Sequence, residues 1–205
     1  MLTLPEQSGH PRSAPKFRSL GLPPVPPELQ RAVEHFYHLE AELLDDWEWR
    51  AWVELFTPDA HYRMPIRRNR LRRQRKTDEA DDLGGLEVAH IDDDRTSLDM
   101  RIQQLESGMH WAEDPPSRSR HLVTNVRVKA AEDADGSPVE GEYHIRSNFL
   151  VHRNRLEAEV DVWAGERRDV LRVDGSGGGP GFRIADRIVL LDQNLVLSKN
   201  LSVLF

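Results

Sequence analysis

Four long segments with the pattern of β-strands follow one another in the second half of the chain, and this run most narrows the possible folds. Alternating or β-branched residues cover 121–129, 142–153, 159–173 and 182–192. A glycine-rich stretch over 175–181 predicts a turn between the last two segments. Consecutive strands joined by short connections form antiparallel sheets, and one face of such a sheet must be covered by other elements.

The first half of the chain supplies helices that can cover that face. Apolar residues recur at steps of three and four over 27–44, and helices are also expected over 47–56 and about 96–106. Helices followed by consecutive strands predict an α+β fold, with N-terminal helices packed on one face of a curved antiparallel sheet. Two shorter strands are expected over 60–66 and 195–205.

Two segments fall outside this pattern. Residues 1–26 are rich in proline and polar residues, and we expect an extended tail ahead of a single domain over 27–205. The region 67–97 is charged and irregular, and we expect it to project from the domain. It opens with a basic run over 67–76, but acidic residues at 78–82 follow at once and largely cancel the local charge.

The overall charge and hydropathy narrow the classes of function. The formal net charge of −7 argues against a general nucleic-acid binder, although the basic run over 67–76 keeps such a contact as an alternative. No stretch approaches the roughly 18 apolar residues of a membrane span, and the N-terminus lacks an apolar core of signal-peptide length. We therefore expect a cytoplasmic protein.

The absence of cysteine excludes several kinds of site. Iron–sulfur clusters need thiolate ligands, and even the Rieske type needs two cysteines beside two histidines. The same count excludes cysteine nucleophiles and thiolate zinc sites.

Histidines and acidic residues leave two kinds of site open. His35, His38 and Glu42 share one face of the first helix at a spacing that a metal could use, although any polar helix face makes such sets. A histidine paired with an aspartate in a cone-shaped pocket would suit a dehydratase or isomerase. The candidates for that pair are His61, His121, His144 and His152 with Asp45, Asp46 and Asp161, and ordinary structural histidines remain the simpler interpretation.

Several longer segments, in a fixed order, resemble a known family. Their sequences are those of residues 43–47 (LLDDW), 113–126 (EDPPSRSRHLVTNV), 153–157 (RNRLE), 164–172 (AGERRDVLR), 190–193 (LLDQ) and 197–205 (LSKNLSVLF). Together they resemble the beta (small) subunits of aromatic-ring-hydroxylating dioxygenases, in the toluene, biphenyl and phenylpropanoate branch.

That resemblance implies a fold and a role. The fold would be similar to nuclear transport factor 2 (NTF2-like, cystatin-like), a cone formed by a curved sheet wrapped on helices. Three beta subunits would assemble with three alpha subunits. The alpha subunit would carry a Rieske 2Fe-2S cluster and a mononuclear Fe(II), and electrons would arrive from NADH through a reductase and a ferredoxin. The complex would convert an arene to a cis-dihydrodiol, and this chain would be structural, with no catalytic, metal or cofactor site of its own.

On this interpretation the charged segments lie at contacts with the alpha subunit and with other beta subunits, because arginine suits bidentate pairing across polar interfaces. The competing hypothesis is a stand-alone cone-fold dehydratase or isomerase that uses a His–Asp pair. The candidate interface residues are Trp111, Asp114, Arg118, Arg120, His121, Arg167, Arg168, Asn200 and Phe205.

Overall fold

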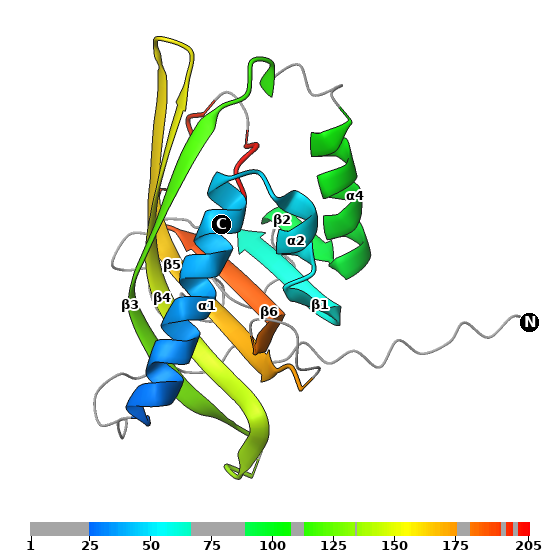
Figure 1. Ribbon diagram of the computed structural model, residues 1–205, viewed down its shortest axis with the longest axis vertical. Coiled ribbons are helices and arrows are strands. Elements are labelled where there is room, and N and C mark those ends of the chain that lie inside the picture. Colours follow the sequence, from blue (N-terminus) through cyan, green and yellow to red (C-terminus); the bar gives the residue numbers. More distant parts are fainter. Residues whose placement is uncertain are drawn as a thin grey trace, which may run out of the picture.

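The computed structural model forms one six-stranded sheet with helices on its inner face (Figure 1). It describes residues 25–66, 89–107, 113–133, 135–175, 181–193, 196–198 and 201–205. The elements are α1 (Pro27–Asp45), α2 (Trp49–Val53), β1 (Phe56–Pro65), β2 (Ala89–Asp94), α4 (Arg95–Glu106), β3 (Arg118–Glu132), β4 (Pro138–Arg155), β5 (Glu159–Val173) and β6 (Phe182–Leu191).

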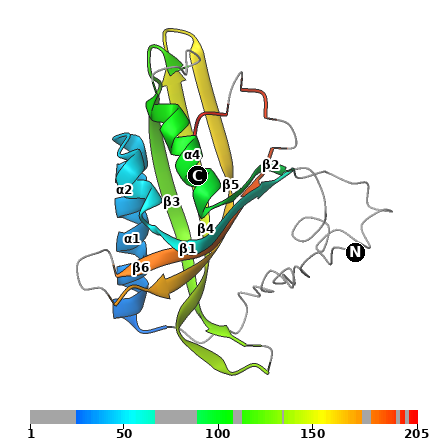
Figure 2. The ribbon, with the colours of Figure 1, turned by 90° about the vertical axis from the view of Figure 1, so that its right-hand side faces the viewer.

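The sheet has the strand order β2-β1-β6-β5-β4-β3. Neighbouring strands run antiparallel except β1 and β6, which run parallel. The sheet curves, α1 lies along it against β3, and α4 packs beside β1 and β2 (Figures 1 and 2). The predicted α+β arrangement is therefore confirmed, with one parallel pair inside a mainly antiparallel sheet.

Helix α1 forms because its apolar residues are spaced along one helical face and because both of its ends suit a helix terminus. Pro27 stands in the first turn, where its missing N–H costs nothing. The side chains that α1 buries recur at steps of three and four, and each large apolar one contributes about 1.5–3 kcal/mol. They are Val33, Phe36, Tyr37, Glu40 and Leu44.

At its C-terminal end α1 closes in a Schellman motif. The Glu48 N–H donates to the Leu43 carbonyl and the Trp47 N–H to the Leu44 carbonyl, at 2.9 and 3.4 Å. Trp47 occupies the left-handed position of this motif, with φ 60°, where glycine is usual. The chain turns sharply there and leaves the indole 44% exposed.

Strands β4 and β5 alternate between the two faces of the sheet along most of their length. In β5 the odd-numbered residues from Trp163 to Leu171 point inward and are buried, and the even-numbered ones point outward. Because a shift of one residue would expose this whole inner set, the register is well specified. The segment 203–205 completes the inner core, where the Phe205 ring meets Phe149 at 5.3 Å and Trp163 at 5.8 Å.

Three expectations differ from the structure. The helix expected over 47–56 is confined to α2, because the left-handed turn at Trp47 precedes it and β1 starts at Phe56. Strand β2 lies in the region expected to be irregular. This segment is a strand because it pairs with β1. The prediction of a strand over 195–205 is wrong, because residues 196–198 and 201–205 are not in a strand. The basic run 67–76 and most of the N-terminal tail lie outside the described residues.

Candidate functional site

The interior of the cone holds a cluster of charged side chains from three elements. Glu40 of α1 accepts hydrogen bonds from Arg167 of β5, at 3.0 Å, and from Arg187 of β6, through Nη1 and through Nη2 at 3.1 Å. Arg187 also donates to both oxygens of Asp169, at 3.0 and 2.8 Å. We call Glu40, Arg167, Asp169 and Arg187 the interior ion cluster. Its two carboxylates balance its two guanidinium groups.

Neutral groups complete the hydrogen bonding around the interior ion cluster. The Tyr37 hydroxyl donates to Asp169 at 2.7 Å, and the Trp52 indole donates to Glu40 at 3.1 Å. Arg187 also donates to the Phe205 carbonyl at 3.0 Å. Arg167 stacks on the Tyr37 ring at 4.8 Å, while its Nε and Nη2 have no hydrogen-bond partner among the described residues.

The electrostatics fix the charges of this cluster. Burial disfavours the Glu40 carboxylate, but Arg187 and Arg167 outweigh that effect and lower its pKa to about 2. Burial and the nearby Asp169 raise the pKa of Tyr37 well above 10. Groups whose pKa lies this far from neutral pH keep one protonation state at that pH. They therefore suit a structural role better than proton transfer.

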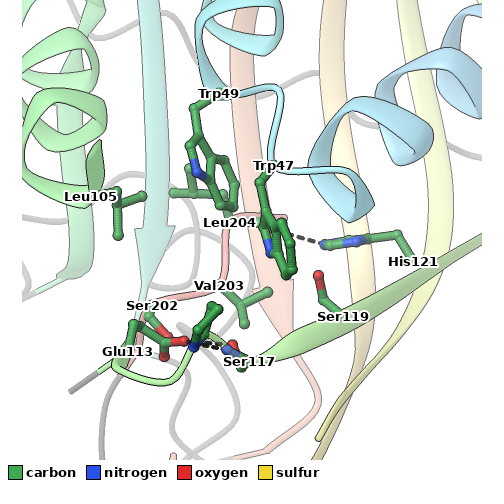
Figure 3. Close-up of a pocket in the computed structure, with 11 residues that line it drawn as sticks. Trp47, Trp49, Leu105, Glu113, Ser117, Ser119, His121, Ser202, Val203 and Leu204 are labelled. Atoms are coloured by element: carbon green, nitrogen blue, oxygen red, sulfur yellow. Dashed lines mark hydrogen bonds between the residues drawn. The ribbon is translucent and has the colours of Figure 1, made fainter. Parts of the chain in front are cut away.

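A pocket of about 130 Å³ opens near the end of α1, between the start of β3 and the segment 201–205 (Figure 3). Two tryptophans and three aliphatic side chains make it mainly apolar. It is lined by Trp47, Trp49, Leu105, Glu113, Pro116, Ser117, Ser119, His121, Ser202, Val203 and Leu204.

His121 borders this pocket and forms one of the His–Asp pairs considered above. Its Nδ1 lies 2.7 Å from Asp45 Oδ1, and its Nε2 lies 2.9 Å from the Leu204 carbonyl oxygen. Its backbone N–H also donates to Asp45 at 3.1 Å. Both ring nitrogens therefore face acceptors within the chain, which leaves neither of them for a substrate proton.

Glu113 is the second polar centre of the pocket. It accepts hydrogen bonds from the Ser117 backbone and hydroxyl, at 3.0 and 2.6 Å, and from the Ser202 hydroxyl. Arg153 donates to Glu113 at 3.2 Å and to Asp161 at 2.7 Å. Burial raises the pKa of Glu113, but the serine hydrogen bonds prevail and the net shift is downward. This centre thus ties the segment 201–205 to the start of β3.

The structure places the predicted interface residues in different environments. Asp114, Arg118 and Arg120 are exposed, and Arg120 pairs with Asp45 at 2.9 Å. Arg168 lies on the outer face of the sheet and pairs with Glu166 at 2.6 Å. Arg167 and Phe205 point inward and have partners inside the chain, as does His121. Trp111 and Asn200 lie outside the described residues.

The remaining histidine candidates give no metal site in the described part of the chain. No group of three or more histidine, cysteine, aspartate or glutamate residues there could hold a metal ion. His35, His38 and Glu42 are exposed on α1. His61 forms a second His–Asp pair, with 2.6 Å between its Nε2 and Asp92 Oδ1, on the outer surface of the sheet.

Sequence reasoning missed the interior ion cluster except for Arg167. Glu40 carried a usable signal, because it occupies a position of the apolar stripe of α1 where a charged residue is almost never buried without a partner. Asp169 and Arg187 each stand beside another charged residue on their strands, and their inward direction becomes clear only once the register is known.

Comparisons with known proteins agree with this geometry. The family described as "Ring hydroxylating beta subunit" matches residues 39–198. The chain is 46% identical to the benzene 1,2-dioxygenase subunit beta of Pseudomonas putida F1, over 89% of this chain and 91% of that protein. It is 42% identical to the biphenyl 2,3-dioxygenase subunit beta of Rhodococcus jostii RHA1, with the same coverage. A solved naphthalene 1,2-dioxygenase with bound indole superposes with a TM-score of 0.72 at 25% identity, covering 88% of this chain and 87% of that one.

Proposed function

The chain belongs to the beta subunits of ring-hydroxylating dioxygenases, and from this premise we propose that it is the structural subunit of a multicomponent dioxygenase. The alpha subunit of that complex would add both atoms of dioxygen to an aromatic ring and give a cis-dihydrodiol. This chain would support the assembly and perform no step of the reaction.

The observation that carries the proposal is the filled interior of the cone. In the place where a cone-shaped enzyme would need a cavity, the interior ion cluster and the aromatic residues around it are in direct contact. Their buried charges are paired, and breaking a pair of this kind costs about 3–5 kcal/mol. This interior is suited to holding helices, sheet and the segment 201–205 in one fixed arrangement.

The His–Asp alternative is not favoured by the geometry around His121. A general base needs a ring nitrogen within hydrogen-bond reach of the substrate. The two nitrogens of His121 contact Asp45 and Leu204, so its role is to join α1, β3 and the segment 201–205.

The cofactors of the reaction would lie on the partners of this chain. A Rieske cluster needs cysteine ligands, and the chain has none. The alpha subunit would hold that cluster and the mononuclear iron, and the NADH-dependent reductase and the ferredoxin would supply electrons. We propose three alpha and three beta subunits in the complex.

The test compares the chain alone with the chain co-expressed with its alpha partner. The purified chain alone should be colourless and free of iron, and should not oxidise an arene when NADH and the redox partners are supplied. Co-expressed with the alpha subunit, it should elute in one large complex that oxidises the arene. Stoichiometric iron on the isolated, folded chain, or a failure to co-purify with the alpha subunit, would contradict the proposal.

A further inference from the structure

The pocket near the end of α1, which we call the indole pocket, has its apolar walls on three separate parts of the fold. Trp47 and Trp49 lie at the turn between α1 and α2, Leu105 lies in the last turn of α4, and Val203 and Leu204 belong to the segment 201–205 (Figure 3). The volume of the pocket is about 130 Å³. Since an apolar protein cavity of about 150 Å³ takes up one benzene molecule, the indole pocket has room for a single six-membered ring.

Trp47 holds a strained backbone conformation at the edge of the indole pocket. Its φ of 60° lies in the left-handed region, where a bulky side chain is disfavoured and glycine is usual. The strain is not offset by deep burial, since the indole stays 44% exposed. Strained residues of this kind cluster at binding sites, where they hold a side chain in a required place. Here the strained turn brings the indole into the lining that Trp49 and Leu204 share (Figure 3).

Glu113 gives the indole pocket a charged group that has no free bonding position. A carboxylate accepts about four hydrogen bonds. Glu113 accepts two from Ser117, one from Ser202 and one from Arg153. The Arg153 guanidinium also pairs with its charge. A ligand cation would therefore find no acceptor left on Glu113, and a ligand anion would meet its negative charge.

The other polar side chains of the lining narrow the ligand further. Both ring nitrogens of His121 already face acceptors in the chain. The indole N–H groups of Trp47 and Trp49 and the Ser119 hydroxyl have no hydrogen-bond partner among the described residues. These groups are uncharged, and aromatic rings pack favourably against one another. The lining thus suits a neutral aromatic molecule, either without polar groups or with one acceptor oxygen.

We propose that the indole pocket binds one molecule of a neutral single-ring arene, held between Trp47, Trp49 and the apolar side chains of the segment 201–205. The site lies outside the interior ion cluster and performs no step of the reaction. Arenes are the compounds that the proposed complex would oxidise, so the choice of arene in the cell rests on the proposed function. The bound ring would join the end of α1 to the segment 201–205 and would stabilise the folded chain by mass action.

The test is a titration of fluorobenzene with the full-length chain, without the alpha subunit, followed by fluorine NMR. We expect saturable one-site binding with a Kd of about 1 mM or tighter. The charged probes 4-fluorobenzoate and 4-fluorobenzylammonium contain the same ring and should bind more weakly by about tenfold or more, because the pocket offers their charge no free partner. The urea midpoint of the wild-type chain should rise when fluorobenzene is added.

Two variants alter the indole pocket in opposite ways. Trp47→Gly removes one wall and relieves the left-handed backbone, so the chain should still fold while fluorobenzene binding weakens by about tenfold or more. Ser119→Phe fills the pocket with a ring of its own and should abolish binding. Leu156→Gly is the matched control. Leu156 is also left-handed, with φ 56°, and is 58% exposed, but it does not line the pocket. Binding to this control should stay within about twofold of wild type.

Urea midpoints measured without ligand show whether each variant is folded. Binding that does not saturate, or saturable binding that survives in both Trp47→Gly and Ser119→Phe, overturns the indole pocket as the site. Equal or tighter binding of either charged probe overturns the neutral ligand class. Co-purification of the wild-type chain with the alpha subunit depends on none of these results, so failure of this inference is distinguishable from failure of the proposed function.

Discussion

Glu40 is the single residue on which the interior ion cluster depends most, because both arginines of the cluster contact it. A carboxylate in this place is stable only while it remains charged. Protonation would leave Arg167 and Arg187 facing a neutral acid, with Asp169 as the remaining carboxylate of the cluster. The stability of the fold should therefore respond to acid through this residue.

We expect the free energy of unfolding to fall as the pH drops through the range between 4.5 and 2. The pKa of Glu40 is lowered from 4.5 to about 2 in the folded chain, so its contribution is present above the unfolded value and is lost as the pH falls through the folded value. The contribution is on the order of 3 kcal/mol. Urea unfolding at stepped pH measures it.

Glu40→Gln should remove that acid dependence and destabilise the chain at neutral pH by about 3–5 kcal/mol, because one buried guanidinium loses its counter-charge. Glu28→Gln, at an exposed position of the same helix, is the control and should behave as wild type. A Glu40→Gln chain with wild-type stability at neutral pH would disprove this account of the cluster.

Gly165 shows how closely β5 approaches its neighbours. A Cβ at this position would lie 2.3 Å from the Leu190 carbonyl oxygen and 2.8 Å from the Phe149 ring. Gly165→Ala should therefore cost about 1–3 kcal/mol through forced displacement of the strands. Gly175→Ala, with open space around the added methyl group, is the matched control. Equal urea midpoints for the two variants would contradict the close packing.

At the scale of elements, the sequence predicts those helices and strands that are determined by the local pattern of apolar residues. Helices α1 and α4 and the strands β3 to β6 follow from spacing and alternation alone. Strand β2 could not be predicted, because its short charged sequence is held in place by pairing with β1. The turn at Trp47 could not be predicted either, because a tryptophan at a left-handed position departs from the usual preference for glycine.

The candidate site is likewise only partly predictable from the sequence. The charged segments are evident in the sequence, but the face of the sheet to which each charged side chain points is not. Arg167 and Arg168 are neighbours, yet one enters the interior ion cluster and the other lies on the outer face of the sheet, because consecutive residues of a strand point to opposite faces. Only the register of the sheet assigns each of them.

His121 connects three elements, which makes it a test of how the cone is closed. His121→Ala would remove the side-chain contacts with Asp45 and Leu204, and should destabilise the chain by about 2–4 kcal/mol. His152→Ala, exposed on the outer face of the sheet, is the control and should change stability little. Hydrogen exchange should show faster opening of the segment 201–205 in His121→Ala. Unchanged exchange there would contradict the connecting role.

At the scale of the whole molecule, one core joins all the elements. Buried apolar residues from α1, α2, α4, every strand of the sheet and the segment 203–205 form a single cluster. None of the described helices is long and apolar enough to cross a membrane. The proposal of one domain over 27–205 follows from this continuous core.

A single domain should unfold in one cooperative transition. Tryptophan fluorescence, which reports on the buried Trp52 and Trp163, and far-ultraviolet circular dichroism should give coincident urea curves. The two tryptophans lie in different regions of the sequence, on α2 and on β5. Two separated transitions would show that the helical part and the sheet are independent units, and would refute the single domain.

The parallel pairing of β1 with β6 has a consequence for synthesis of the chain. During translation β1 leaves the ribosome long before β6, its parallel partner in the sheet. The interval is on the order of ten seconds at ordinary rates of translation. Until β6 arrives, one edge of β1 and the apolar sides of α1 and α2 lack their final partners. The nascent chain therefore passes through a period in which chaperones compete with premature contact between copies on the same polysome.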